Sequence, residues 1–330
     1  MISRLFNPRW LHPEGYHGGD KRSPYFEGWY FKIVDRTAHH RYAIIPGISL
    51  STAGDGPHSF VQVLDGVSGQ AIYQRYGVDD FAADEVGVNV RVGPNVFTWD
   101  RMHIELDSSD LRLHGDVRFL GARPWPVTPT SPGIMDWYTW VPRMECYHGV
   151  LSLDHGLSGT LTAGDTSIDF AEGRGYVEKD WGQSFPSGWI WMQTNHFAIA
   201  GISLTASIAM IPWIGRAFPG FIVGLLLDDT LYRFATYTGA TTTHLSLTEE
   251  VVTWRMQDAL YILDIVAHRA DAGKLRGPSR HDMGRPVPET LGARVDVTLR
   301  TRFGDTIIYS GTGACAGMEI GGDIAPLLRS

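Results

Sequence analysis

The 330-residue sequence has only two cysteines, Cys146 and Cys315, and neither lies in a CxxC pair or another zinc-binding spacing. Two cysteines are too few for a disulfide framework, so reduced thiols in a cytoplasmic protein are the simplest interpretation. Residues 1–15 contain no apolar run of the length that a signal peptide needs. We therefore expect a cytoplasmic protein.

Basic runs are also missing. The 28 Lys and Arg residues are outnumbered by 36 Asp and Glu, and the net charge of −8 disfavours a nucleic-acid partner. No GxGxxG motif opens a helix, and the chain has neither a Walker loop nor a GxSxG elbow. The histidines lack zinc-site spacing, and His39 and His40 fall in an expected turn. The sequence thus predicts no cofactor and no metal.

One run without Asp, Glu, Lys or Arg, residues 196–215, approaches the minimum length of a membrane span. It is rich in Gly, Ser, Thr and Ile, it contains Pro212, and strand-like segments flank it. These features favour two buried strands, and we expect no transmembrane segment.

The sequence does contain many tryptophans and glycines, 11 and 38 respectively. About twenty short β-rich runs alternate with Gly, Asp and Pro turn signals, and the only helical candidates are short, near residues 79–83 and 324–328. So many strands must close or stack to hide their edges. The pattern predicts an all-β chain of two barrel-like units, 1–182 and 183–330.

Strand alternation places individual side chains. In residues 25–35, Tyr25, Glu27, Trp29, Phe31 and Ile33 share one face, which is otherwise apolar or aromatic. A carboxyl group there must either be paired or stay protonated with a raised pKa. Glu27 is therefore a candidate acid, and a buried ion pair with a neighbouring arginine is the alternative.

Residues 143–154 carry several ionisable side chains in succession. Alternation puts Glu145 and Tyr147 on one face and Cys146 and His148 on the other. Either Glu145 and Tyr147 or His148 can face a site, although a lone histidine is more often a satisfied core residue.

Residues 175–197 combine three tryptophans with the triplet Glu178-Lys179-Asp180. Glu178 and Asp180 share a face, with Lys179 and Trp181 opposite. A strand over 188–197 aligns a second aromatic and amide set typical of a ligand pocket: Trp189, Trp191, Gln193, Asn195 and Phe197. A sandwich core beside a surface charge cluster is the alternative.

Four segments of the chain resemble the signature segments of tocopherol cyclases: residues 22–32, 144–149, 176–197 and the MEIGG sequence at 318–322. The resemblance implies two lipocalin-like antiparallel β-barrels in tandem, a fold shared with carotenoid hydratases and some Diels–Alderases. It also implies cofactor-free cyclisation of a prenylated hydroquinone to a chromanol.

Such a reaction needs a desolvated acid that protonates an alkene, so that a phenol oxygen traps the resulting cation. Glu27 fits this role, Asp180 and Glu145 come next, and His148 or Tyr147 can relay the proton. Aromatic rings stabilise the cation and exclude water, which favours substrate binding by Trp29, Trp181, Trp189 and Trp191, with Gln193 and Asn195 supplying polar contacts.

Two other functions stay open. A lipocalin-like carrier would bind a hydrophobic isoprenoid without converting it, but it needs no acid on an apolar face. The same fold could also catalyse hydration or pericyclic ring closure. Residues 211–221 gather Ile, Trp and Phe around two prolines, and an exposed turn there would allow peripheral contact with a membrane. Ordinary packing is the alternative.

Overall fold

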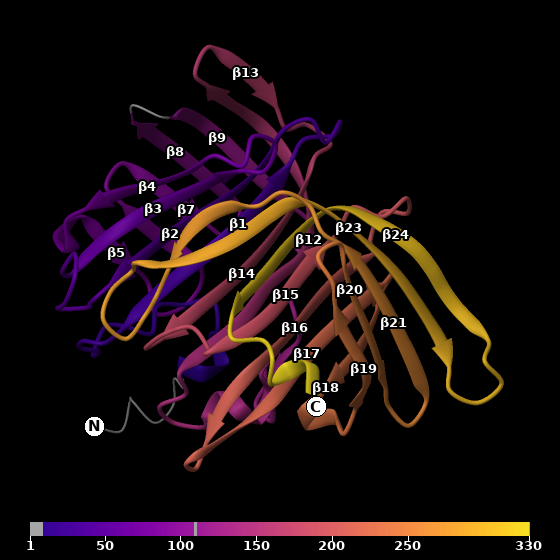
Figure 1. The fold of residues 1–330 in the computed structure, drawn as a ribbon. Helices are drawn as coiled ribbons and strands as arrows, with labels where there is room; N and C mark the ends of the chain where they lie inside the picture. The colour runs from indigo at the N-terminus through magenta and orange to yellow at the C-terminus, as the bar shows by residue number, and fades with distance from the viewer. Residues whose placement is uncertain (1–8, 109–110, 330) are drawn as a thin grey trace. The chain divides into compact units, whose positions relative to one another are not determined.

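A computed structural model describes residues 9–108 and 111–329, and it is built from antiparallel β-strands (Figure 1). The first sheet has twelve strands. In spatial order these are β4 (Ala71–Tyr76), β3 (His58–Asp65), β2 (Arg41–Ser49), β1 (Phe26–Val34), β14 (Arg174–Gly182), β12 (Cys146–Ala163), β9 (Arg112–Leu120), β8 (Arg101–Asp107), β7 (Asn95–Thr98), β6 (Asn89–Val92) and β5 (Phe81–Ala83), with β13 (Thr166–Asp169) paired to β12.

The second sheet has ten strands. Their spatial order is β18 (Thr230–Ala235), β17 (Arg216–Leu227), β16 (Ser203–Trp213), β15 (Gly188–Thr194), β24 (Ile307–Gly322), β23 (Arg285–Thr301), β21 (Tyr261–His268), β20 (Val251–Gln257) and β19 (Thr241–Leu247), with β22 (Gly273–Gly277) paired to β23. Within the described residues, no strand pairing joins the two ends of either sheet into a ring.

The helical elements of the described residues are all short 3₁₀ turns. They are η2 (Arg9–Leu11), η3 (Val78–Asp80), η4 (Asp136–Trp140), η5 (Thr236–Thr238) and η6 (Leu327–Arg329). The short helix expected near 79–83 is instead the turn η3 followed by β5. The one expected near 324–328 is instead the turn η6. The loop over 121–140 contains η4 and a small hairpin of β10 (Val127–Thr128) and β11 (Ser131–Pro132). The all-β prediction is confirmed.

The chain forms two compact units. Unit 1 comprises the described residues of Met1–Asp65, together with Gln70–Phe185 and Leu275–Pro286. Unit 2 comprises Gly66–Gly69, Pro186–Lys274 and the described residues of Val287–Ser330. Each unit thus includes one short segment from the part of the sequence that mainly forms the other unit: Leu275–Pro286 in unit 1 and Gly66–Gly69 in unit 2. The boundary at 182/183 inferred from the sequence stays a prediction.

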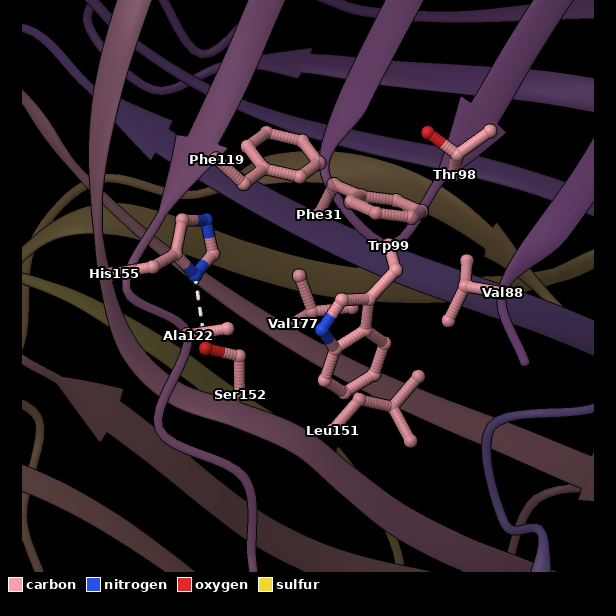
Figure 2. Close-up of a pocket in the computed structure, with 10 residues that line it drawn as sticks. All are labelled: Phe31, Val88, Thr98, Trp99, Phe119, Ala122, Leu151, Ser152, His155 and Val177. Carbon is pink, nitrogen blue, oxygen red and sulfur yellow. Dashed lines mark hydrogen bonds between the residues drawn. The ribbon is translucent and has the colours of Figure 1, made fainter.

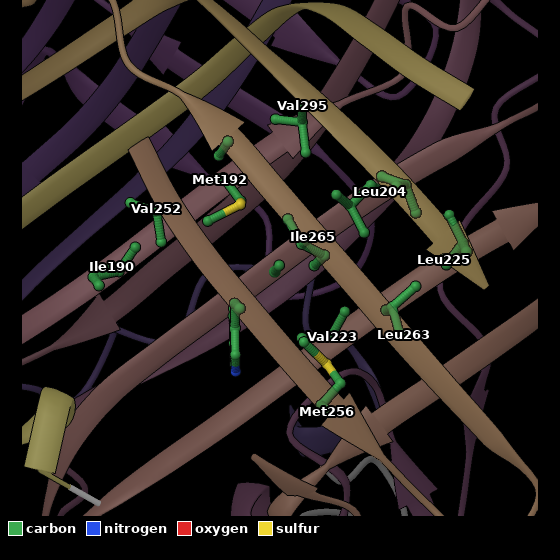
Figure 3. Packing of buried hydrophobic residues seen from close by; sticks show 14 of the residues in the cluster. Ile190, Met192, Leu204, Val223, Leu225, Val252, Met256, Leu263, Ile265 and Val295 are labelled. Carbon is green, nitrogen blue, oxygen red and sulfur yellow. The ribbon is translucent and has the colours of Figure 1, made fainter. Parts of the chain in front are cut away.

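Each sheet wraps around a core of its own. In unit 1, residues from strands far apart in the sheet order, such as Val63 on β3, Val90 on β6 and Leu161 on β12, belong to one buried cluster. In unit 2 the corresponding cluster includes Ile190, Met192, Leu204 and Ile265 (Figure 3). Burial of these side chains on one face of each sheet provides most of the driving force for folding.

The run over 196–215 forms the loop before β16, the strand itself and the turn after it, and therefore contains one strand where two were expected. No helix in the described residues is both long and apolar enough to cross a membrane.

Candidate active site

The charged triplet lies on β14, between β1 and β12. In the register, Trp29 of β1 is opposite Lys179 and Glu27 is opposite Trp181. On the other side of β14, His148 of β12 is opposite Asp180 and Val150 is opposite Glu178. Directly opposite residues in an antiparallel pair point to the same face. The predicted separation of Glu178 and Asp180 from Lys179 and Trp181 is confirmed, and it places the polar groups around the triplet in two clusters, one on each face of β14.

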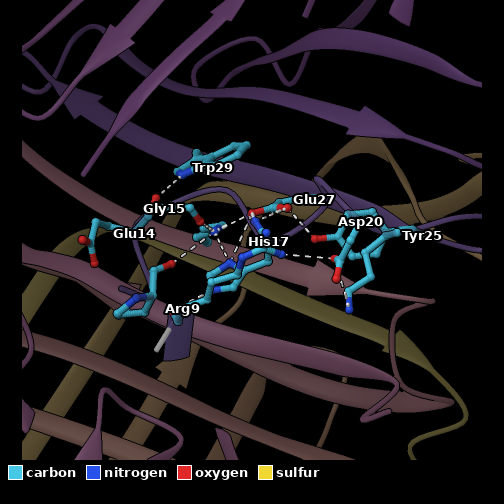
Figure 4. A network of polar contacts seen from close by, with 11 residues as sticks. Arg9, Glu14, Gly15, His17, Asp20, Tyr25, Glu27 and Trp29 are labelled. Atoms are coloured by element: carbon cyan, nitrogen blue, oxygen red, sulfur yellow. Dashed lines mark hydrogen bonds and ion pairs between the residues drawn. The ribbon is translucent and has the colours of Figure 1, made fainter. Parts of the chain in front are cut away.

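The first cluster surrounds Glu27, whose side chain has no exposed area (Figure 4). Lys179 Nζ lies 2.6 Å from Glu27 Oε1. The backbone N–H of His17 donates to both carboxylate oxygens at 3.0 Å, and Tyr25 donates its hydroxyl to Oε2. Burial alone would raise the pKa of Glu27, but the Lys179 ammonium and the hydrogen bonding of His17 outweigh it and hold the pKa below its ordinary value.

Glu27 is therefore a buried carboxylate, and the expected protonated acid with a raised pKa is wrong. The reason is the register between β1 and β14, which brings a lysine to the carboxyl group. The alternative, a buried ion pair, is the one found, and the partner is Lys179 on the neighbouring strand.

Lys179 also holds the N-terminal segment and two tryptophans. Its ammonium donates to the carbonyl oxygens of Pro13, at 3.2 Å, and Gly15. It lies 4.7 Å from the ring centroid of Trp29 and 4.6 Å from that of Trp181. In this structure both indoles therefore pack around the protein's own cation. Their predicted contact with substrate stays a prediction.

The second cluster, on the opposite face of β14, brings together His148, Glu178 and Asp180. His148 Nδ1 lies 2.9 Å from Asp180 Oδ1, and His148 Nε2 lies 3.8 Å from Glu178 Oε2. Tyr176 donates its hydroxyl to Glu178 at 2.5 Å. Glu178 is buried, whereas His148 and Asp180 are half-buried. The cluster therefore contains one desolvated carboxyl group beside two side chains that remain accessible from outside.

One imidazole and two carboxylates are suited to holding and passing on a proton near neutral pH. The ligand atoms of the three residues lie within 4.8 Å of one another, and such a donor set also suits a divalent cation. The expectation of no metal rested on spacing along the chain, which does not reveal a group assembled from two strands. Cys146 Sγ lies 3.9 Å from Asp180 Oδ1, and burial together with the neighbouring carboxylates raises the pKa of this thiol.

Two further candidates, Glu145 and Tyr147, have other partners. Glu145 Oε1 accepts hydrogen bonds from Ser184 at 2.9 Å and Arg280 at 3.3 Å. The Tyr147 hydroxyl donates to the Val141 carbonyl at 2.6 Å, and its ring stacks on Trp181. The structure therefore brings together His148 and Asp180 from the predicted acids and relays, and adds Glu178, which was not predicted as catalytic.

In unit 2, β15 alternates as expected. Ile190 and Met192 enter the core of the unit, so the residues that alternate with them along β15 project from the other face. Those residues are buried as well: Trp189, Trp191 and Gln193, followed by Asn195 after the strand. Trp189 Nε1 donates to Glu319 Oε2 at 2.8 Å, and Glu319 is opposite Glu289 in the register. Substrate binding by this set stays a prediction.

Unit 1 also has a small, mostly apolar pocket (Figure 2). Its walls include Phe31, Phe119, Trp99 and Leu151, and His155 lies at one side. His155 Nδ1 is 2.9 Å from Ser152 Oγ. The other end of the imidazole occupies the space beside Gly175, where an added Cβ would lie 2.2 Å from Nε2. The close packing of Gly175 thus explains the position of this histidine better than a ligand does.

Comparison with solved structures defines the class of fold. A Nitrosomonas europaea protein described as "a putative ATTH" has a TM-score of 0.55 and 15% identity, over 93% of this chain and 94% of that one. CghA has a TM-score of 0.60 and 11% identity, over 92% and 90% of the two chains. These likenesses confirm the expected fold, a tandem lipocalin-like all-β protein.

Comparison of sequences defines the family. The family model described as tocopherol cyclase-like matches residues 127–322, more than half of the chain, and the chain belongs to that family. A protein of Oryza sativa subsp. japonica named "Probable tocopherol cyclase, chloroplastic" is 22% identical over 281 residues, which cover 68% of this chain and 59% of the rice protein. The chain therefore spans less than two thirds of that relative's length.

Proposed function

We propose that the protein is a cofactor-independent enzyme that cyclises a prenylated hydroquinone, or a related isoprenoid aromatic compound, to a chromanol-type ring. The observation that carries the proposal is the His148–Glu178–Asp180 cluster in a member of the tocopherol cyclase-like family. The reaction requires a group that donates a proton to the alkene and later accepts one from the phenol, and these three side chains can do both.

In the first step, the protonated cluster donates its proton to one carbon of a trisubstituted alkene, and the π bond breaks. The neighbouring carbon becomes a tertiary carbocation. The phenol oxygen of the same substrate then attacks this carbon and forms the C–O bond. The phenol proton returns to the cluster, so substrate and product have the same composition and the cluster is regenerated.

Each residue of the cluster has its own role in the proposed proton transfer. Asp180, at 2.9 Å from His148 Nδ1, fixes the orientation of the imidazole ring. Glu178 is oriented by the Tyr176 hydroxyl and lies 3.8 Å from His148 Nε2, to which we assign the exchange of the proton. We assign the acid to the imidazolium of His148, with the carboxylates as its partners.

The surroundings of the cluster suit a carbocation. Tyr30 of β1 is opposite Glu178 in the register, and both Tyr30 and Tyr176 are buried. Aromatic ring faces attract a nearby cation by ~0.5–2 kcal/mol. Gly28 is opposite Asp180 and places no side chain beside that carboxylate.

Incubation of the purified protein with a prenylated hydroquinone in D₂O tests the reaction. Alkene protonation places one deuterium on a carbon of the product, and the protein should yield such a chromanol. Asp180→Asn and His148→Gln should each lose at least about 100-fold in rate, the usual contribution of a general acid. Asp116→Asn is the matched control, because Asp116 pairs with His103 at 3.1 Å on the exposed surface of the same unit.

The other functions give different outcomes. Pericyclic closure gives a cyclised product without carbon-bound deuterium, and hydration gives a product heavier by one water. Binding without conversion supports a carrier. Full activity in both cluster variants would remove the cluster from the mechanism even if cyclisation occurs.

A cytoplasmic location completes the proposal. Both cysteines, Cys146 and Cys315, are free thiols, as a reducing compartment favours. The substrate is a hydrophobic small molecule, and no nucleic acid takes part.

A further inference from the structure

The hairpin of β16 and β17 ends in a turn whose first residue is unsuited to it. Trp213 pairs with Arg216, so Ile214 and Gly215 form a two-residue turn, with φ of 43° and 74°. Positive φ at both positions is typical of a type I′ turn, which favours Asn-Gly. A β-branched residue rarely adopts positive φ, because its side chain crowds the backbone there. Isoleucine at position 214 therefore strains the turn.

Packing does not compensate for this strain. The Ile214 side chain is 88% exposed, the highest exposure among the large apolar residues described as exposed. Ile208 and Phe221 are the last pair of this hairpin whose members both belong to the buried core, and Met210, two pairs further on, still packs against it. Three more pairs, ending with Trp213 and Arg216, lead to the turn. At ~3.3 Å per residue, the turn lies about 17 Å beyond the core pair.

The chemistry of the hairpin end is apolar and cationic. Pro212 and Ala217 are exposed, and Trp213 meets Phe218 in an edge-to-face pair at 6.4 Å. Arg216, also exposed, is the only charged residue between positions 211 and 221. No acidic residue occurs between 181 and 227, although the whole chain has a net charge of −8.

We propose that this hairpin end, residues 211–219, docks the protein on an anionic lipid surface. Ile214 enters the acyl region, Trp213 and Phe218 lie at the headgroup level that aromatic residues favour, and Arg216 pairs with a lipid phosphate. A lipid surface suits a narrow projecting turn because it needs no matching groove. The inference goes beyond the proposed reaction and does not depend on it.

Co-sedimentation of the full chain with vesicles tests the proposal. The vesicles contain phosphatidylcholine alone or with added phosphatidylglycerol. Wild-type protein should sediment with the anionic vesicles, and Ile214→Asn should bind about tenfold or more weakly, because it removes the apolar group that inserts. Arg216→Gln should weaken binding to the anionic vesicles and should reduce its sensitivity to salt.

Two controls keep the result interpretable. Ile214→Asn creates the Asn-Gly sequence that a type I′ turn favours, so its melting temperature should equal or exceed that of wild type. Ile307, another exposed isoleucine, begins β24, and Ile307→Asn should bind vesicles as wild type does. The proposal is overturned if wild type ignores both vesicle types, if Ile214→Asn binds unchanged, or if Ile307→Asn loses as much binding.

Discussion

Lys179 Nζ lies 2.6 Å from Glu27 Oε1, and neither side chain has any exposed area. The two residues are 152 positions apart in the sequence, yet adjacent strands place them on the same face of one sheet. A buried charge without a partner is costly, because it has lost its hydration. The main effect of removing one partner would therefore be a buried charge without a counterion, which destabilises the folded protein.

Glu27→Gln should destabilise the protein by about 3–5 kcal/mol, because the Lys179 charge would stay buried without its counterion. Urea denaturation of the variant measures the loss. Glu105→Gln provides the control, since Glu105 is exposed on β8, and it should change stability by less than about 0.5 kcal/mol.

A double-mutant cycle with Met at both Glu27 and Lys179 should be strongly non-additive. The double variant removes both charges together and should therefore lose less stability than the sum of the two single losses. Additive losses would mean that the two side chains do not interact in the folded protein.

Acid should destabilise the protein through His155. Burial, with a smaller effect of the Arg174 charge, lowers the pKa of His155 to about 3 in the folded state, from an ordinary value of 6.5. The unfolded chain then binds the proton more readily, so this contribution to stability is complete above pH 6.5 and is lost as the pH drops towards 3, by roughly 5 kcal/mol in total. His155→Gln should flatten the stability curve between pH 6.5 and 4. Equal slopes in wild type and His155→Gln would contradict this assignment.

Gly175→Ala should cost about 1–3 kcal/mol, because the new Cβ would lie 2.2 Å from His155 Nε2 and force the imidazole or the strand to move. At Gly156, opposite Arg174 in the same strand pair, an added Cβ meets its nearest atoms at 3.7 Å, which is ordinary contact. Gly156→Ala should therefore cost clearly less. Thermal melting of both variants measures the difference, and similar losses would argue against a clash with His155.

Exhaustive treatment with a chelator should leave cyclisation unchanged, because the proposed proton transfer uses only the side chains of His148, Glu178 and Asp180. The measurement is the initial rate before and after chelation. Activity that disappears and returns with one divalent cation would instead assign the cluster to that cation, which its donor set also suits.

Strand alternation was enough to predict how side chains divide between faces. It placed Glu27 with Trp29, and it separated Glu178 and Asp180 from Lys179, because a two-residue period needs only local sequence. The same reasoning could not say which strands become neighbours. The Glu27–Lys179 pair depends on β1 meeting β14, and the sequence offered no signal for that pairing.

The candidate site likewise has a part that strand alternation predicts and a part that depends on strand pairing. Glu178 and Asp180 were placed together from their spacing, and His148 was a candidate in isolation. Their meeting depends on the register of β12 against β14, which contains two irregularities just beyond this point, between Val150 and Ser152 and between Ser152 and His155. Such bulges change register without a clear mark in the sequence. Glu178 was missed as a functional residue for this reason.

The alternation of charge along Glu178, Lys179 and Asp180 also constrains the assembly of the sheet. If β14 slipped by one residue against β1, the carboxylates would turn towards the apolar core and the ammonium would leave Glu27. Every such mispairing would bury charges without partners, at several kcal/mol each. The triplet thus disfavours incorrect registers of β14. A shift by an even number of residues keeps each charge on its native face of the sheet, but only the native register brings Lys179 to Glu27.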